Sequence, residues 1–211
     1  GLYLSYTFNT SITGNTISRP TRTTVDDFYG VYLTQLNTKD SIYRNRITDP
    51  FGGSLTNTND FYGVYFTGVD ALVSLENIVA NNLIYNITGA GATYAFYNSS
   101  SDNVYYYHNT IALDGGTTSA SYATRGLYIT TSQVDGVAFV NNIVAITRTG
   151  PGPKHALYIG TTTSSIISDR NVLFIAPNAG NAFIGYYTAN QPTLSNWQTA
   201  TGGYDTTSLT S

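Results

Sequence analysis

The feature that most constrains this chain is a four-residue motif, small–apolar–Tyr–apolar, that recurs about every 30 residues. Its clearest copies lie within residues 27–34 and 60–67, two similar segments that are 33 residues apart. Further copies begin at Gly1, Ala95, Gly126 and Ala156, and a degraded seventh is Ala182-Phe183-Ile184-Gly185. A period of this length predicts a solenoid, in which each repeat packs only against its neighbours.

A second motif alternates with the first and consists of Asn, any residue, and then Ile, Val or Leu. Its six copies begin at Asn15, Asn45, Asn82, Asn109, Asn142 and Asn171. The residue three positions earlier is apolar or aromatic in five of the six copies. Two motifs in a fixed order predict three short strands per repeat: one with the Tyr, one before the Asn and one after it.

These strands could also form a sandwich or a propeller, but the Asn motif favours a parallel β-helix. Such a fold turns sharply between strands, and we expect each Asn to adopt the left-handed backbone conformation at this corner, which Asn tolerates well. Corner amides of coils stacked about 4.8 Å apart can hydrogen-bond in a ladder. The six Asn residues are therefore interpreted as structural corners.

Composition agrees with an all-β fold and excludes several kinds of protein. Only 10% of the residues are charged, and the net charge of -3 provides no broad basic surface, so nucleic acid is not an expected partner. There is no Cys, hence no disulfide or thiolate site. No membrane span is expected, because no apolar run approaches the roughly 18 residues that a spanning helix needs. The chain lacks an initial Met, and we expect that it is processed or continues upstream.

The repeats resemble those of right-handed parallel β-helices in large secreted bacterial surface proteins, within the pectate-lyase-like superfamily. The resemblance rests on Gly126-Leu127-Tyr128-Ile129, on the Asn corners, and on a tail with Trp197-Gln198, two Gly and Asp205-Thr206-Thr207-Ser208. It implies about seven coils of roughly 30 residues in residues 1–188. Residues 189–211 would be a non-repeat segment packed on the last coil. The implied location is secreted or on the bacterial cell surface.

Enzymes of this superfamily use clustered acidic residues, calcium and an Arg base, or several Asp residues with a His. Here Asp40, Asp102 and Asp135 precede corners, where an Asp in a turn is the ordinary explanation. Asp26-Asp27 and Asn59-Asp60 are a candidate for collecting one calcium ion, although capping a turn is favoured. His108 and His155 lie in different repeats. We therefore predict no catalytic residues and no metal ligands, and no cofactor apart from this candidate calcium ion.

The Tyr motif is the most informative feature for function. Because strand neighbours alternate between faces, the apolar residues on either side of each Tyr are expected to fill the interior. The tyrosines would then stack outward, with the small residue two positions earlier leaving space on the same face. Their rings could stabilise the sheet or form a track for a glycan or a protein. The candidate ligand-binding residues are Tyr3, Tyr32, Tyr65, Tyr97, Tyr128 and Tyr158.

The sequence favours a non-catalytic structural or adhesive segment of a large surface protein, which contacts glycans or a partner protein. The alternative is a polysaccharide lyase or glycoside hydrolase that acts in a surface groove. A third hypothesis, ice binding, requires a regular Thr-x-Thr array, whereas Thr161-Thr162-Thr163 is local. Since Gly1 already belongs to a Tyr motif, we expect further domains of the same polypeptide or a neighbouring chain to cover this open end.

Overall fold

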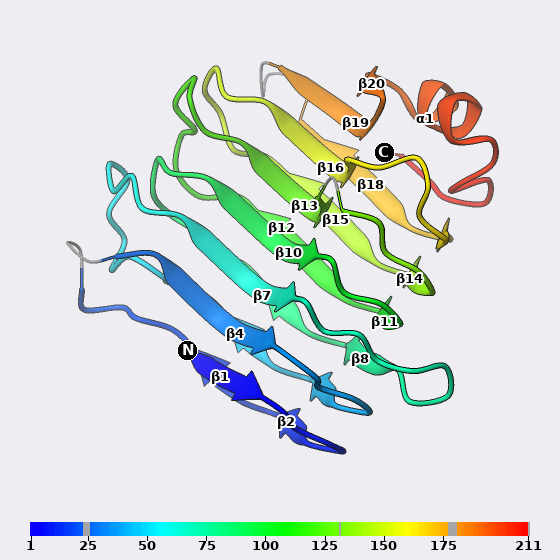
Figure 1. Ribbon diagram of the computed structural model, residues 1–211. Helices are drawn as coiled ribbons and strands as arrows, with labels where there is room; N and C mark the ends of the chain where they lie inside the picture. Colours follow the sequence, from blue (N-terminus) through cyan, green and yellow to red (C-terminus); the bar gives the residue numbers. More distant parts are fainter. Residues whose placement is uncertain (23–25, 131, 177–180, 211) are drawn as a thin grey trace.

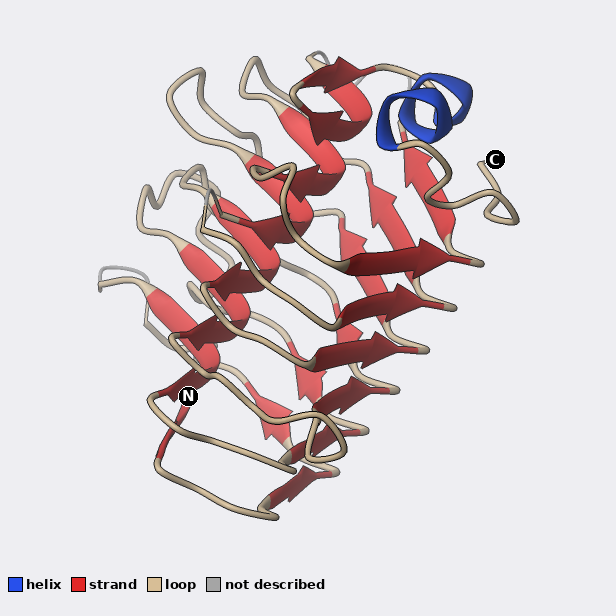
Figure 2. Cartoon of the chain, turned by 45° about the vertical axis from the view of Figure 1, so that its right-hand side comes forward, coloured by secondary structure: helices blue, strands red, loops and turns tan. Residues whose placement is uncertain are grey.

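The computed structural model describes residues 1–22, 26–130, 132–176 and 181–210. The chain forms a β-solenoid of about six turns with three parallel sheets (Figures 1 and 2). The predicted fold class, an all-β solenoid with three strands per turn, is thus confirmed, with about six turns where about seven were expected. We call the sheet that carries the Tyr motifs the tyrosine sheet, and the sheets before and after the Asn corners the second and third sheets.

In the described residues the tyrosine sheet has eight strands, of which only the last pair is antiparallel. It contains β1 (Leu2–Ser5), β4 (Phe28–Thr34), β7 (Phe61–Thr67), β10 (Thr93–Ser99), β13 (Thr124–Ile129), β16 (Lys154–Ile159), β19 (Ala182–Tyr187) and β20 (Ala189–Gln191). The second sheet contains β2 (Ser11–Thr13), β5 (Ser41–Tyr43), β8 (Asn77–Ala80), β11 (Val104–Tyr107), β14 (Val137–Val140) and β17 (Ile166–Asp169). The third contains β3 (Thr16–Ile17), β6 (Arg46–Ile47), β9 (Leu83–Ile84), β12 (Thr110–Leu113), β15 (Ile143–Ile146) and β18 (Val172–Ile175).

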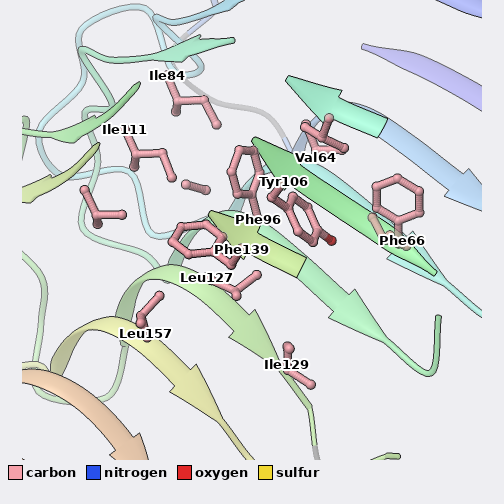
Figure 3. Close-up of a cluster of buried hydrophobic side chains, with 14 of the residues drawn as sticks. Val64, Phe66, Ile84, Phe96, Tyr106, Ile111, Leu127, Ile129, Phe139 and Leu157 are labelled. Atoms are coloured by element: carbon pink, nitrogen blue, oxygen red, sulfur yellow. The ribbon is translucent and has the colours of Figure 1, made fainter. Parts of the chain in front are cut away.

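The core runs along the solenoid axis and is filled by the inward residues of all three sheets (Figure 3). Val64, Phe96 and Leu127, which precede the Tyr positions, are buried, as are Phe66 and Ile129, which follow them. The expected interior positions are therefore confirmed in the central turns. Each turn repeats the same apolar contacts with the turns on either side, so hydrophobic burial stabilises the stack along its whole length.

The small residue of the Tyr motif points inward, and the expectation that it shares the outward face of the tyrosines is wrong. A Cβ atom on Gly30 would overlap the carbonyl oxygen of Gly63 and lie 3.0 Å from a side-chain carbon of Ile47. Ala95, in the equivalent position of β10, is fully buried. Two successive inward residues, such as Gly30 and Val31, interrupt the alternation of faces and bend the strand.

The Asn residues form a ladder between the second and third sheets. From Asn15 to Asn142, each backbone N–H donates to the side-chain oxygen of the next Asn at 2.9–3.0 Å, and each side-chain nitrogen donates to the same oxygen at 3.0–3.3 Å. The side-chain nitrogens from Asn45 onward also donate to a carbonyl of the preceding turn. The ladder therefore fixes the register of neighbouring turns.

The left-handed residue at each corner is the one before the ladder Asn, so the expectation that the Asn itself adopts this conformation is wrong. Positive φ angles of 55–70° occur at Gly14, Arg44, Asn81, His108, Asn141 and Arg170. Because each ladder Asn lies beyond this corner, its side chain turns inward and uses its amide for hydrogen bonds. His108 is one of these corner residues and is exposed.

The C-terminal segment covers the last turn. Helix α1 (Leu194–Thr201) places Trp197 in the core, where the ring is fully buried. Residues 205–209 then return to the corner, where Ser208 Oγ accepts a hydrogen bond from the Asn171 backbone N–H at 2.7 Å. Leu209 pairs with Val172 as one further rung of the third sheet. Figure 2 shows the helix at this end of the stack.

The register of β19 corrects the expected seventh motif copy. Leu157 pairs with Gly185 and Tyr158 with Tyr186, so the Tyr position of this strand is Tyr186 and not Ile184. Phe183 pairs with His155 and is not an interior residue. The space above Leu157 is filled by Trp197 instead, since a Cβ atom on Gly185 would overlap the indole ring. No helix in the described residues has the length and apolar character needed to cross a bilayer.

Candidate functional site on the tyrosine sheet

The outward face of the tyrosine sheet carries two parallel columns of side chains, one of which the sequence motif predicts. The tyrosine column consists of Tyr3, Tyr32, Tyr65, Tyr97, Tyr128, Tyr158 and Tyr186. Its first six members are the predicted candidate ligand-binding residues, and the strand register brings them together. In Figure 1 the strands of this sheet lie in front, and no loop is drawn across β4, β7 and β10.

The second column, here called the mixed column, was missed by the sequence interpretation. It consists of Tyr29, Tyr62, Tyr94, Arg125, His155 and Phe183, each three residues before a tyrosine of the first column. Strict alternation places residues two apart on one face, whereas the bend at the small residue makes this spacing three. The signal was present in the sequence, because residues 28–32 and 61–65 both contain two tyrosines at this spacing.

Most ring faces in the two columns pack against other rings. Tyr29 and Tyr62 stack at 4.7 Å between centroids, Tyr32 and Tyr65 at 4.8 Å, and Tyr158 and Tyr186 at 4.2 Å. Tyr97 instead meets Tyr65 and Tyr128 edge to face. Such pairs each contribute about 0.5–1.5 kcal/mol beyond their burial. The columns therefore stabilise the sheet, and this structural role leaves few ring faces for a ligand.

The phenol hydroxyls remain available to a ligand. Among the described residues, the hydroxyls of Tyr32, Tyr65, Tyr97 and Tyr128 have no protein hydrogen-bond partner, and their side chains are half-buried. Burial raises the pKa of Tyr32 and Tyr97, so these groups are neutral donors and acceptors at physiological pH. A further outward row at the ends of the strands consists of Ser5, Thr34, Thr67 and Ser99. The face is thus a regular array of hydroxyl groups on an aromatic base.

Arg125 interrupts the mixed column and is held by the tyrosines. Its guanidinium carbon lies 3.9 Å from the ring centroid of Tyr128 and 3.7 Å from that of Tyr158. These are close cation–π contacts. In the part of the chain that the structure describes, the guanidinium donates no hydrogen bond to the protein, and its buried Nε has no partner.

His155 follows Arg125 in the mixed column and is almost fully buried, at 2% exposure. Its ring stacks on Phe183 at 5.3 Å, and its Nε2 lies 2.8 Å from the side-chain oxygen of Asn190. Burial lowers the pKa of His155 to about 4; the hydrogen bond with Asn190 opposes this effect, and the positive charge of Arg125 adds to it. The imidazole is therefore neutral at physiological pH.

The candidate calcium residues lie beside the start of the mixed column and bind backbone groups. Asp27 Oδ1 accepts a hydrogen bond from the Asp60 N–H at 2.8 Å, and Asp60 Oδ1 accepts one from the Ala92 N–H at 3.0 Å. Each carboxylate thus caps the loop of the next turn, which is the ordinary structural role. Among the described residues, no group of three or more His, Asp or Glu side chains is placed to hold a metal ion.

The other acidic candidates have similar roles in the loops that follow the strands of the tyrosine sheet. Asp102 Oδ1 accepts a hydrogen bond from the Asp135 N–H at 2.7 Å, and Asp135 Oδ1 accepts one from the Ser165 N–H at 3.2 Å. Asp40 is buried and accepts one from the Thr10 N–H at 2.7 Å. These carboxylates join consecutive turns and are not gathered in one groove.

An open cavity of about 660 Å³ adjoins the tyrosine column at the first turn. It is lined by Tyr3, Tyr29 and Tyr32 together with Arg19 and Asp27.

Comparisons of the chain with family models, with curated proteins and with solved structures found no match to any of them.

Proposed function

We propose that this chain is a rigid, non-catalytic segment of a large secreted or cell-surface bacterial protein, and that its tyrosine sheet contacts glycans. The observation that carries the proposal is the array of phenol hydroxyls that have no hydrogen-bond partner among the described residues and are held at the spacing of the turns. The resemblance of the Asn corners and the Trp197 tail to secreted bacterial β-helices supports the proposed location.

The regular spacing favours a ligand that is itself a polymer with a short repeat. Parallel strands place equivalent hydroxyls about 4.8 Å apart along the solenoid axis. A polysaccharide presents hydroxyl groups at every sugar unit and can bind several turns at once, so weak single contacts add up. Stacked rings also restrict the tyrosine side chains before binding, which reduces the entropy lost on association.

Rigidity follows from the same architecture. The Asn ladder and three parallel sheets connect each turn to the next, and Trp197 and Asp205 close the last turn. Such a segment holds its face in one orientation over its length, which suits a shaft that presents a binding surface.

Glycan binding can be tested with a Tyr65→Phe/Tyr97→Phe double variant. Both changes remove a hydroxyl and keep the ring contacts. We expect immobilised or soluble polysaccharides to bind the unchanged chain, and the double variant to bind about tenfold more weakly, because two hydrogen bonds are lost. Binding would be measured by calorimetry after a glycan array has identified ligands.

Tyr43→Phe is the matched control, because Tyr43 faces outward on β5 of the second sheet. It should bind as the unchanged chain does. Equal binding by all three proteins would show that the tyrosine sheet is not the contact surface, and no binding to any glycan would contradict the proposal.

The enzyme alternative is tested separately by incubating the protein with pectins, alginates and other acidic glycans, with and without calcium. We expect neither unsaturated sugars nor new reducing ends. Turnover that is lost when Asp27 or Asp60 is replaced by Asn would instead establish a lyase or hydrolase.

A further inference from the structure

The two outward columns carry one cationic side chain, Arg125, and nothing in the described residues neutralises it. The guanidinium lies against Tyr128 and Tyr158, and it forms neither a hydrogen bond nor an ion pair with the residues that the structure describes. Its Nε is buried without a partner, although the residue as a whole is half-exposed. The N–H groups of the guanidinium, which have no partner among the described residues, are therefore available to a ligand.

The tyrosines and the histidine around Arg125 do not supply a negative charge. Burial raises the pKa of Tyr94 and of Tyr158, against the opposing effect of Arg125, so neither ring is a phenolate at physiological pH. The next residue of the column, His155, is neutral. The carboxylates beside this face, Asp27 and Asp60, accompany Tyr29 and Tyr62 at the other end of the mixed column.

A guanidinium in this setting favours an anion with two oxygens. It is planar and weakly hydrated, and it can donate two parallel N–H···O bonds to a carboxylate or a sulfate. Rings on either side lower the local dielectric and strengthen the attraction. They also fix the side chain, so little rotamer entropy is lost on binding.

We propose that Arg125 is an anion subsite within the tyrosine sheet, and that the glycans this sheet prefers carry carboxylate or sulfate groups. This inference rests on the proposed function. The subsite would orient the bound ligand. Its acidic group binds over β13 and β16, whereas Asp27 and Asp60 repel that group from β4 and β7.

The test compares three oligosaccharide classes of equal length by calorimetry: a polygalacturonate, a sulfated galactan and a neutral galactan. The unchanged chain should bind at least one acidic class about tenfold more tightly than the neutral one, with an affinity that falls as salt rises. The two acidic arms distinguish carboxylate from sulfate as the recognised group.

Arg125→Gln should bind acidic and neutral oligosaccharides equally, and Arg125→Lys, which keeps the charge, should retain part of the preference. Arg46→Gln is the matched control, because Arg46 is exposed on β6 of the third sheet, and it should behave as the unchanged chain. Thermal unfolding of each variant checks that the fold is kept.

An unchanged preference in a folded Arg125→Gln variant would overturn the subsite. Equal binding of neutral and acidic oligosaccharides by the unchanged chain would overturn it as well, and would leave glycan binding by the tyrosine sheet intact. Absence of binding in all three classes would contradict both proposals.

Discussion

Asp205 Oδ2 accepts a hydrogen bond from the indole Nε1 of Trp197 at 2.9 Å. The same carboxylate accepts hydrogen bonds from the side chains of Asn171, Ser168 and Ser208 at 2.6–2.8 Å. Asp205 is fully buried, and all its partners in the described residues are neutral donors. A single side chain thus joins the core residue of the C-terminal segment to the end of the Asn ladder.

Replacing Asp205 by Ala should unfold this cap first. Four donors lose their acceptor in a buried site, and we expect a loss of about 3–5 kcal/mol in the free energy of unfolding. Urea titrations followed by circular dichroism would measure it, and the fluorescence of Trp197 would report the cap itself. The exposed carboxylate of Asp26 provides the control, since Asp26→Asn should change the stability by under about 0.5 kcal/mol. A stable Asp205→Ala protein with unchanged fluorescence would contradict this role.

Trp197 and Gly185 should show strong coupling. Trp197→Ala leaves a large cavity over Leu157, with a cost of about 3–5 kcal/mol. Gly185→Leu alone should also destabilise, because the new side chain overlaps the indole ring. The double variant should be more stable than Trp197→Ala, since Leu then fills the position that Leu127 and Leu157 fill in the preceding turns. Additive losses in a double-mutant cycle would refute the proposed packing.

The Asn ladder should contribute most to the free energy of unfolding at the positions where its amides are buried. Asn109→Ala removes the acceptor of both Asn82 donors, and we expect a loss of about 2–4 kcal/mol. Asn15→Ala is the matched comparison, because Asn15 is exposed and accepts no hydrogen bond from the described residues; its loss should stay below about 1 kcal/mol. Both values come from urea midpoints. Similar losses at the two positions would show that the ladder does not act through buried amides.

His155 makes stability depend on pH. Burial lowers its pKa from 6.5 to about 4 in the folded chain, so the unfolded chain takes up the proton first as the pH falls. The stability that the neutral imidazole contributes is present above pH 6.5 and is lost as the pH falls toward 4. Between pH 7 and pH 5 the loss is about 2 kcal/mol. His155→Phe should lack this part of the pH dependence in urea titrations, while the control His108→Asn should retain it.

The sequence predicts the architecture well because the same information occurs many times. Every turn repeats the apolar residues around the Tyr and the Asn at the corner, so an exception such as Asn98, which follows Tyr97 and is buried, does not hide the pattern. The six ladder residues and the outward tyrosines follow directly from this repetition.

Other features arise from contacts that no repeat encodes. The mixed column depends on the bend at Gly30 and its equivalents, which shifts the outward spacing from two to three. The register of β19 was misassigned because Trp197, from outside the repeat, replaces the interior residue at Gly185. Ser208 ends the ladder without being an Asn, so its role is visible only in the hydrogen bond to Asn171.

The ladder also has an electrical polarity. Within the row, each side-chain amide from Asn15 to Asn142 donates to the next Asn on its C-terminal side, and each side-chain oxygen from Asn45 to Asn171 accepts from the preceding Asn, so these amide–amide hydrogen bonds all point the same way. Aligned dipoles sum to a partial positive charge at their donor end, as they do at the start of a helix. That end is Asn171, and the carboxylate of Asp205 lies directly on it. The row of amides thereby acts as a distributed counter-charge for a buried acid whose printed donors in the described part of the chain are all neutral.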